Sequence, residues 1–582
     1  MRRRLAVLLS VAAAAVLSAS AASPAAAQDR AVTERLQERI RLRLEGEPET
    51  AAAREPTLRS DGRRIQATRS LRRFYGERVH LPAWVTADGR VRPGAREMLA
   101  GLRSAREHGL PPDDYHAARI ESLLSELDAG REGAGARFPD ADTDRRLRLL
   151  AELDLLLTDA FLSYGSHLVS GRVDPRSIDP LWTVNGRERN MAALLARTLE
   201  QGRSPRAALA ELAPRHPGYA RLQEALTEYR RMAAAGGWPT VPGGPALRAG
   251  DAGPRVADLG RRLAASGELS ADDGKDDAVS DTVFGDALDA AVRSFQRRHG
   301  LEADGIVGEA TLGALNIPAE SRVRQIERNL ERWRWLPAEL GETHLRVNIA
   351  DFGLEVVEGD STVLSMRAVV GRDYRQTPVF SDTMRYVVLN PTWNVPRSIA
   401  ARDILPRLRE SVSYLEEQGM VVYDGWSPDA RPVDPSAVDW SRLSADSLPY
   451  RFVQRPGPLN ALGRVKFMFP NQFAVYIHDS PARSLFGRSV RSFSSGCIRV
   501  ERPLELLDYV LRGSEEWSPA KLRGALETGR EQTIRLPREL PVHIEYWTAW
   551  VPEEDGAVHF RPDVYGRDAR LASALEAEPP GD

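Results

Sequence analysis

The chain contains one cysteine in 582 residues, and a histidine lies nineteen positions before it. His478 closes the apolar run 473–477, and Cys497 directly follows Ser495 and Gly496. A thiol becomes a strong nucleophile when a neighbouring group removes its proton, and an imidazole suits that task near neutral pH. A lone cysteine is otherwise a small buried hydrophobe, and a lone histidine is otherwise a packed or surface residue. The flanking residues favour a site for cysteine acyl transfer.

The loop before the cysteine is suited to holding a negative charge that develops during such a reaction. Gly496 would let the backbone approach a substrate closely. The backbone amides of Ser495, Gly496 and Cys497 are therefore candidates for an oxyanion hole.

A family resemblance supports this interpretation. The two runs 478–481 (His-Asp-Ser-Pro) and 494–499 (Ser-Ser-Gly-Cys-Ile-Arg) resemble the signature of the YkuD-type L,D-transpeptidase catalytic domain, in its large multidomain periplasmic branch. Many members of that family have a histidine where this chain has Ser495. The departure removes a possible second imidazole, so His478 is the only candidate base inside the motif.

The resemblance implies an activity on peptidoglycan. Family members cut the bond between the third residue of a tetrapeptide stem and D-Ala, keep the acyl group as a thioester and pass it to an amine of a second stem. The product would be a 3-3 type cross-link, made without a cofactor because one amide replaces another. Penem-type β-lactams are the inhibitors that the resemblance implies.

Two other functions compete with this prediction. Water instead of an amine would make the protein an L,D-carboxypeptidase or an endopeptidase, and one sequence does not decide between the acceptors. A non-catalytic wall-binding scaffold is the alternative from another class. It would retain its function in a Cys497→Ala variant.

Five further residues are assigned supporting roles. Arg499 either binds a substrate carboxylate or holds the loop, and Ser494 is expected to shape that loop. Tyr476 lies two residues before His478, on the same face of a strand, and is expected to line the pocket. Trp393 and Gly463 belong to segments similar to family segments near the substrate groove, and each could equally be a core or turn residue.

Composition and the N-terminus indicate an exported, soluble, multidomain protein. The chain is 42% apolar and 28% charged, and its net charge of −2 gives no electrostatic case for binding nucleic acid. Basic residues 2–4, the apolar run 5–16 and Ala25 to Ala27 predict a secretory signal peptide over 1–27, with the periplasm or cell envelope as destination. An uncleaved membrane anchor is the alternative. The ten histidines are scattered, so no metal site is expected, and the sequence identifies no partner among cell-wall synthesis proteins.

Periodicity divides the rest of the chain into helical and strand-rich parts. The predicted order is a flexible lead-in over 28–66, a helical scaffold domain over 67–240, a small three-helix domain over 245–318 and a connecting helix over 319–342. Residues 295–301 (Phe-Gln-Arg-Arg-His-Gly-Leu) and Asp304 with Gly305 give the three-helix domain its resemblance to peptidoglycan-binding domains. From the residues alone it is only a helical bundle with glycine turns.

Alternating apolar residues then predict a β-rich, sandwich-like or half-barrel catalytic domain over 343–548. Leu345, Val347 and Ile349 start this pattern. A long interruption over 396–455 is expected to cap the active site and control access to it. A closing hairpin and a loose tail are expected over 549–582. The predicted fold is therefore a multidomain α+β architecture.

Overall fold

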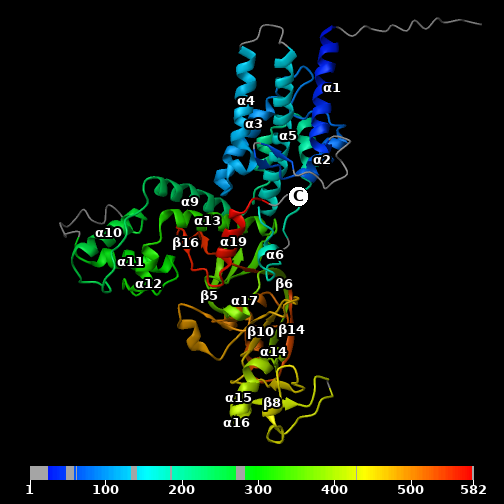
Figure 1. The fold of residues 1–582 in the computed structure, drawn as a ribbon. Coiled ribbons are helices and arrows are strands. Elements are labelled where there is room, and N and C mark those ends of the chain that lie inside the picture. Colours follow the sequence, from blue (N-terminus) through cyan, green and yellow to red (C-terminus); the bar gives the residue numbers. More distant parts are fainter. Residues whose placement is uncertain are drawn as a thin grey trace, which may run out of the picture.

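The computed structural model describes residues 24–46, 58–60, 62–132, 140–183, 186–269, 282–427 and 429–579. The chain forms an elongated molecule (Figure 1). Helices α1 to α5 lie at one end, α10 to α12 project to one side, the β domain lies in the middle, and the segment around α15 and β8 forms the other end. The predicted multidomain α+β architecture is confirmed. Most of the predicted signal peptide, and residues 270–281 of the predicted three-helix domain, lie outside the described residues.

Helix α5 is the centre of the N-terminal helical part and packs against α1, α2, α4 and α7. The elements of this part are α1 (Pro24–Glu45), β1 (Arg59–Ser60), β2 (Arg63–Arg64), α2 (Thr68–Glu77), α3 (Gly94–Arg103), α4 (Ala117–Glu132), α5 (Asp140–Ser170), α6 (Pro175–Ile178), α7 (Met191–Glu200), α8 (Pro205–Ala210) and α9 (Pro217–Ala234), with 3-10 turns at Ser104–His108 and Pro112–Tyr115. The buried apolar residues of α1 to α5, α7 and α8 form one core, whereas those of α9 belong to the core of the β domain.

The lead-in over 28–66, expected to be mobile or weakly helical, forms helix α1 in its first part (residues 24–45). Leu36, Ile40 and Leu44 are buried in the core that α5 shares. They recur every fourth residue and therefore lie on one face of the helix. Because the segment is polar on average, its composition does not reveal the apolar stripe along one face of the helix.

The three-helix unit consists of α10 (Pro254–Ala265), α11 (Asp286–Arg298) and α12 (Glu309–Leu315) around a small core. Gly305 has a φ of +77°, and a Cβ at that position would clash with Asp289. Asp304 Oδ1 accepts hydrogen bonds from Gln296 Nε2 (2.8 Å) and from the Ile306 amide (2.9 Å). The Asp-Gly pair thus forms a turn that α11 fixes in place.

Helix α13 (Ala319–Trp335) connects this unit to the β domain, and its last two turns are almost entirely buried. Glu331 Oε1 accepts the amides of Arg172 (2.5 Å) and Val173 (2.9 Å) at the end of the helical part. On the opposite side, Arg332 pairs with Asp568 of the C-terminal segment (2.6 Å). α13 therefore joins parts that are far apart in the sequence.

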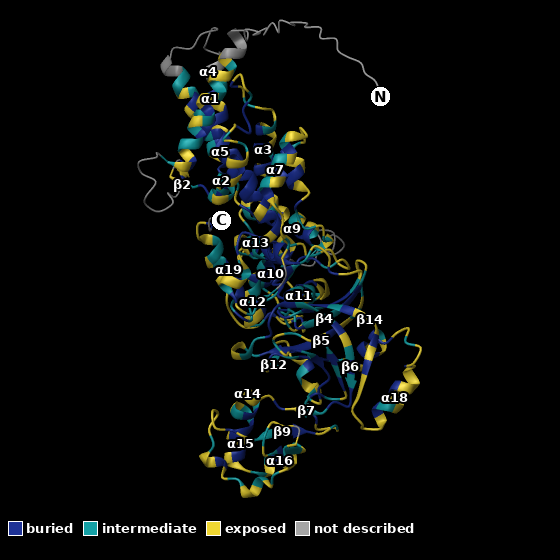
Figure 2. Ribbon diagram, turned by 90° about the vertical axis from the view of Figure 1, so that its right-hand side faces the viewer, coloured by how far each residue is buried: buried dark blue, intermediate teal, exposed yellow. Residues whose placement is uncertain are grey.

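The β domain is built on one nine-stranded sheet with the strand order β12-β5-β13-β11-β10-β6-β14-β3-β4. The long strand β5 also pairs with β4, so the sheet closes on itself. The strands are β3 (Thr343–Asn348), β4 (Gly353–Glu358), β5 (Ser361–Gly371), β6 (Phe380–Leu389), β10 (Val465–Met468), β11 (Ile477–His478), β12 (Ser492–Ser494), β13 (Ile498–Val500) and β14 (Gln532–Glu545), with a 3-10 turn at Asp373–Arg375. Helices α17 (Pro503–Val510) and α18 (Pro519–Glu527) follow β13, and the enclosed core is dark blue in Figure 2.

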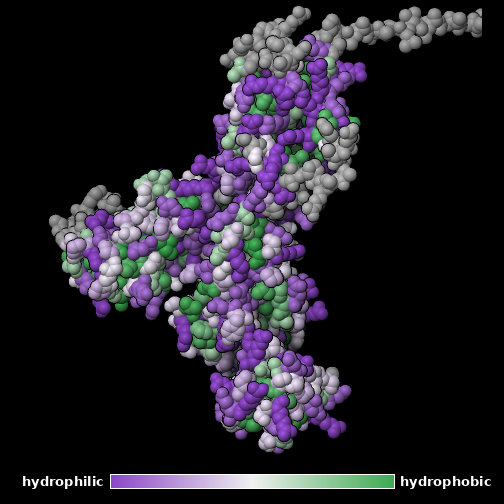
Figure 3. Space-filling view, in the orientation of Figure 1, coloured by the Kyte–Doolittle hydropathy of each residue, from purple (hydrophilic) through white to green (hydrophobic). Residues whose placement is uncertain are grey.

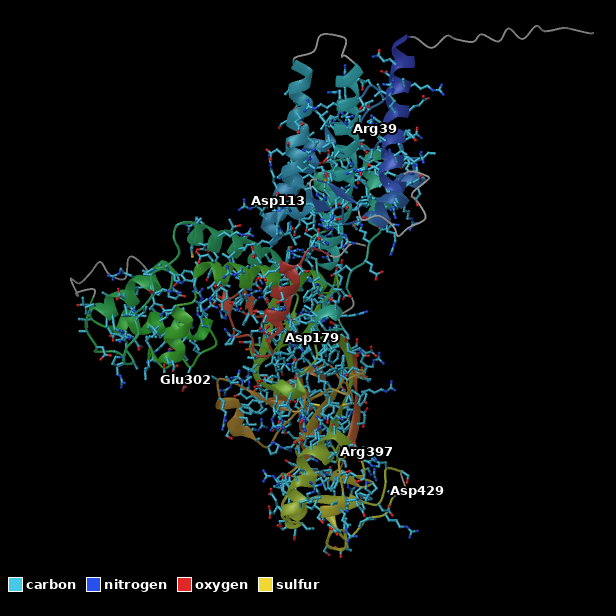
Figure 4. All side chains as sticks on the ribbon, in the orientation of Figure 1. Arg39, Asp113, Asp179, Glu302, Arg397 and Asp429 are labelled. Carbon is cyan, nitrogen blue, oxygen red and sulfur yellow. The ribbon has the colours of Figure 1, made fainter. Side chains whose placement is uncertain are left out.

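The insertion over 396–455 folds as a cap with its own apolar core. Its three-stranded sheet has the order β7-β9-β8. The cap contains β7 (Trp393–Asn394), α14 (Arg397–Ile399), a π-turn (Ala400–Ile404), α15 (Leu405–Glu410), α16 (Ser413–Glu417), β8 (Met420–Tyr423), 3-10 turns at Pro435–Ala437 and Trp440–Arg442, and β9 (Arg451–Gln454). The cap projects beyond the β domain, and Arg397 lies near the boundary between the two (Figure 4).

The C-terminal segment contains the predicted hairpin and one further helix. Strands β15 (Ala549–Trp550) and β16 (His559–Phe560) pair antiparallel. The tail predicted to be loose is instead helix α19 (Arg567–Glu576), in which Leu571 is buried and Arg567 bonds Asp179 (2.7 Å) at the foot of the helical part (Figure 4). The prediction failed because these partners are distant in the sequence.

The surface in view in Figure 3 is mainly hydrophilic, and apolar residues appear on it only in small groups. No helix among the described residues is both long enough and apolar enough to cross a membrane.

Candidate active site

Parallel strand pairing brings the two predicted catalytic residues together. Strand β11 ends at His478, and β13 begins directly after Cys497. The strands pair in parallel with His478 opposite Arg499, and the Ile498 amide donates to the Tyr476 carbonyl (3.1 Å). Two residues that are nineteen positions apart in the sequence therefore lie on neighbouring strands.

Four side chains of these strands lie on the same side and line one cavity of about 1210 Å³. They are Tyr476, His478, Cys497 and Arg499. Because side chains alternate along a strand, Ile477 and Ile498 point the opposite way and are buried in the core.

His478 is held in one tautomer and is neutral. Its Nδ1 lies 2.6 Å from the carbonyl oxygen of Asp479. Because a carbonyl can only accept, Nδ1 carries the proton and Nε2 keeps a lone pair. Burial lowers the pKa of His478 to about 3, and the positive charges of Arg499 and Lys466 act in the same direction. The carbonyls of Asp479 and Leu462 oppose this shift only in part.

Cys497 is half-buried, and its thiol is also neutral at rest. Burial raises its pKa. Four groups act the other way and would favour a thiolate: the amide and the hydroxyl of Tyr476, which hydrogen-bond the sulfur, and the charges of Lys466 and Arg499. The site thus pairs a neutral thiol with a neutral imidazole, beside groups suited to stabilise the thiolate once it forms.

Asp479 fixes the segment that carries His478. Its Oδ1 accepts from the Ser480 amide and from Arg483 (both 2.7 Å), and its Oδ2 accepts from the Arg464 amide (2.8 Å). Gly463 has a φ of +61°, and a Cβ there would lie 2.4 Å from the Asp479 carboxyl carbon. Gly463 is therefore not a wall of the cavity, as one prediction had it. It makes room for the carboxylate that supports the histidine.

The loop before the nucleophile is organised by Ser494. Its hydroxyl donates to the Cys497 carbonyl (2.5 Å) and accepts the Gly496 amide (3.1 Å). The predicted use of the Gly496 amide in an oxyanion hole is therefore wrong, because that donor is already occupied. Among the described residues, the amides of Ser495 and Cys497 have no hydrogen-bond partner. Gly496 itself has a φ of +114°, a conformation that favours glycine.

Two cations of the cavity were missed in the sequence. Lys466 lies on β10 opposite His478, and its ammonium is 3.9 Å from the centre of the Tyr476 ring. Arg375 donates to the Ser495 hydroxyl (2.8 Å) and pairs with Asp403 of the cap (2.5 Å). The alternation of Lys466 with buried Val465 and Phe467 was the available signal for the first of them. No local pattern marks Arg375.

Residues of β12, β7 and α14 are among those that line the cavity. These elements lie between the rest of the large sheet and the rest of the cap (Figure 2). Trp393 lines the cavity together with residues of the cap: Pro396, Ser398, Ile399, Arg402, Asp403, Ile404, Pro406, Arg407, Glu410, Tyr414, Gln418, Met420 and Gln454. The described part of the chain contains no group of three histidine, cysteine or acidic residues arranged to hold a metal ion.

Comparisons with known proteins assign families to three stretches of the chain. Residues 342–522 match the L,D-transpeptidase catalytic domain (YkuD), residues 252–315 match a domain described as "putative peptidoglycan binding domain", and residues 69–226 match a scaffold domain. A "putative L,D-transpeptidase" from Haemophilus influenzae is 32% identical over 255 residues, which are 43% of this chain and 50% of that protein. This chain thus spans half the length of that curated relative.

Solved structures of L,D-transpeptidases resemble the chain only distantly. The protein from Mycobacterium smegmatis is 12% identical with a TM-score of 0.17, covering 35% of this chain and 58% of its own. The protein from Stackebrandtia nassauensis is 14% identical with a TM-score of 0.19, covering 53% and 96%. The family matches and the curated relative carry the assignment: the chain contains a YkuD-type L,D-transpeptidase catalytic domain, preceded by a scaffold domain and a peptidoglycan-binding-type domain.

Proposed function

We propose that this protein is an L,D-transpeptidase that works by cysteine acyl transfer, with Cys497 as nucleophile and His478 as general base and acid. The supporting observation is that two adjacent parallel strands present both residues on one cavity, with Nδ1 of His478 directed to the Asp479 carbonyl. The match of residues 342–522 to the catalytic domain agrees with this assignment.

In the first half-reaction the Cys497 sulfur attacks the carbonyl carbon of the third residue of a stem peptide. Nε2 of His478 takes the thiol proton as the carbon–sulfur bond forms, so no thiolate has to exist beforehand. The carbon–nitrogen bond then breaks, and His478 gives the proton to the departing amine of D-Ala. A thioester on Cys497 remains.

In the second half-reaction an amine of another stem attacks the thioester. His478 accepts a proton from that amine, the carbon–sulfur bond breaks, and the thiol is regenerated. The product is a new amide, a 3-3 type cross-link, and no cofactor takes part.

The amides of Ser495 and Cys497 are the proposed oxyanion donors in both half-reactions. Removing one donor from such a hole costs roughly 3–4 kcal/mol of transition-state stabilisation. The Tyr476 hydroxyl supports the sulfur whenever it carries charge.

The substrates follow from the domain content. The catalytic domain would act on peptidoglycan stems, and the domain at 252–315 would hold the enzyme on the same polymer. The proposed location is therefore extracytoplasmic, in the cell envelope, after export by the segment predicted over 1–27. Penem-type β-lactams are proposed as inhibitors that acylate Cys497.

The test is incubation of the purified protein and its Cys497→Ala variant with tetrapeptide muropeptides. We expect cross-linked dimers and released D-Ala from the wild type and neither product from the variant. Tripeptide without dimer would instead identify a hydrolase that uses the same thioester. Equal function of the variant in cells would identify a wall-binding scaffold.

A further inference from the structure

Two cations lie on either side of the catalytic histidine, in one row across the sheet. His478 on β11 has Lys466 opposite it on β10 and Arg499 opposite it on β13. All three side chains line the cavity. Adjacent strands are roughly 4.8 Å apart, so the two cationic residues start from backbone positions about 10 Å apart and converge on the space above His478.

Neither cation has a carboxylate partner among the described residues. Arg499 Nε is buried without a hydrogen-bond partner, and the nearest group to the Lys466 ammonium is the face of the Tyr476 ring. Glu531 raises the pKa of Lys466, but the two side chains form no ion pair. Burial lowers the pKa of Lys466 and of Arg499, because each charge is partly removed from water without an anion to compensate it.

Two other arginines of the cavity wall do have a carboxylate close by, whereas Arg372 and Arg402, which also line it, form no ion pair among the described residues. Arg375 pairs with Asp403, and Arg407 lies 3.5 Å from Glu410. The two unpaired charges that flank His478 are next to the thiol, where the substrate would supply the missing anion.

The residue that departs in the proposed reaction carries such an anion. In a stem that ends at this residue, the terminal carboxylate is separated from the attacked carbonyl carbon by only two atoms, the amide nitrogen and Cα. Arg499 lies two residues beyond Cys497 on the same side of β13, roughly 6.6 Å along the strand. A guanidinium and an ammonium at this distance can reach a carboxylate attached to the reacting group.

We propose that Lys466 and Arg499 form an anion subsite that binds the free terminal carboxylate of the donor's departing residue. This inference rests on the proposed function and assigns two residues to the tetrapeptide-donor requirement that the family resemblance implies. The enzyme accepts donors in which the residue after the scissile bond is the last one. An amidated terminus lacks the charge, and a stem one residue longer moves the carboxylate away by roughly 3.5 Å.

The test compares two donors that differ only in this charge: a tetrapeptide stem ending in D-Ala and the same stem ending in D-alaninamide. Thioester formation on Cys497 is followed by rapid quenching and intact-protein mass spectrometry. For the wild type we expect kcat/KM to be roughly ten- to a hundredfold higher with the free carboxylate, the size expected for a charge-assisted hydrogen bond. The double variant Lys466→Met with Arg499→Gln is expected to acylate at similar rates with both donors.

Control variants separate recognition from folding and from total charge. Arg523→Gln removes one exposed positive charge on α18 outside the cavity and should leave the donor preference unchanged. Arg499→Lys keeps the charge and should retain most of the preference. Circular dichroism checks that each variant is folded.

Equal acylation of the wild type by both donors would overturn the inference. So would a double variant that slows by the same factor with both donors, because the cations would then act on the oxyanion or on the fold. Absence of a thioester with either donor in the folded wild type would instead overturn the proposed function, and this inference with it.

Discussion

Lowering the pH tests whether the thiol and the imidazole are both neutral at rest. We expect acylation of Cys497 by a penem or a stem donor to stay within about twofold between pH 8 and pH 5. The reason is that His478 can accept the thiol proton as long as Nε2 is unprotonated. With a pKa of about 3, the imidazole remains in that state over the whole range.

The effect of pH on folding stability follows from the lowering of the His478 pKa from 6.5 to about 3. This lowering corresponds to a preference of roughly 5 kcal/mol for the neutral ring in the folded state. The unfolded chain takes up this proton near pH 6.5 and the folded chain only near pH 3. The contribution to stability is therefore complete above pH 6.5 and is lost as the pH falls through that window. The lower limit of pH 5 leaves most of it in place.

The assay follows penem acylation by intact-protein mass spectrometry at several pH values, with circular dichroism at each. Alkylation of Cys497 by iodoacetamide is measured in parallel, because it reports the thiolate alone. For a neutral thiol its rate should rise about tenfold per pH unit from pH 6 to pH 8. His478→Gln is the control: it should slow acylation by roughly a hundredfold or more and keep the same slope of alkylation with pH.

Two results would refute this reasoning. Acylation that falls tenfold for each pH unit below 6.5, in protein that stays folded, would mean that His478 titrates like an ordinary histidine. An alkylation rate that is constant from pH 5 to pH 8 would mean that the pair rests as thiolate and imidazolium.

Three further predictions concern the surroundings of the site. Gly463→Ala should lower the free energy of unfolding by roughly 1–3 kcal/mol and slow acylation, because the new methyl group displaces the Asp479 carboxylate; denaturant titration and penem acylation measure the two effects. Asp403→Asn breaks the ion pair with Arg375 and should raise the KM for donor stems about two- to fivefold, with unchanged iodoacetamide alkylation; an unchanged KM would argue against a role of the cap in holding substrate. Leu571→Ala should lower the free energy of unfolding by roughly 2–5 kcal/mol in chemical denaturation, and a negligible loss would mean that α19 does not pack as described.

Local pattern was sufficient to pick out residues that lie together in the cavity, but not the residues that support them. The single cysteine, the histidine at the end of an apolar run and the alternation along that run placed Tyr476 and His478 on one face. The position of Lys466 depends on the antiparallel register of β10 with β11, which the turn between those strands sets. Arg375 is more than one hundred residues from Cys497 and reaches it only through the folded sheet.

The two errors at the site have the same physical origin. Gly496 was assigned a free amide because glycine permits close approach, but the Ser494 hydroxyl two residues earlier competes for that amide. Gly463 was assigned to a wall because it lies in a segment near the groove. The space left by its missing side chain instead holds the carboxylate of Asp479, sixteen residues later. Tertiary contacts decide which partner a backbone group binds and which side chain fills the space beside a glycine. Such contacts are not local in the sequence.

Buried contacts join α13 to the segment after β14. Gln325 Nε2 donates to the carbonyls of Thr548 (2.8 Å) and Arg561 (3.0 Å), and the Arg322 guanidinium lies 4.4 Å from the centre of the Phe560 ring. A cation–π contact contributes about 0.5–2 kcal/mol and a hydrogen bond about 0.5–1.5 kcal/mol, so these contacts together hold the C-terminal segment against α13. The three-helix unit contacts the same segment directly, because Arg298 of α11 donates to the Val558 carbonyl (3.2 Å). The segment after β14 is therefore held by both α11 and α13.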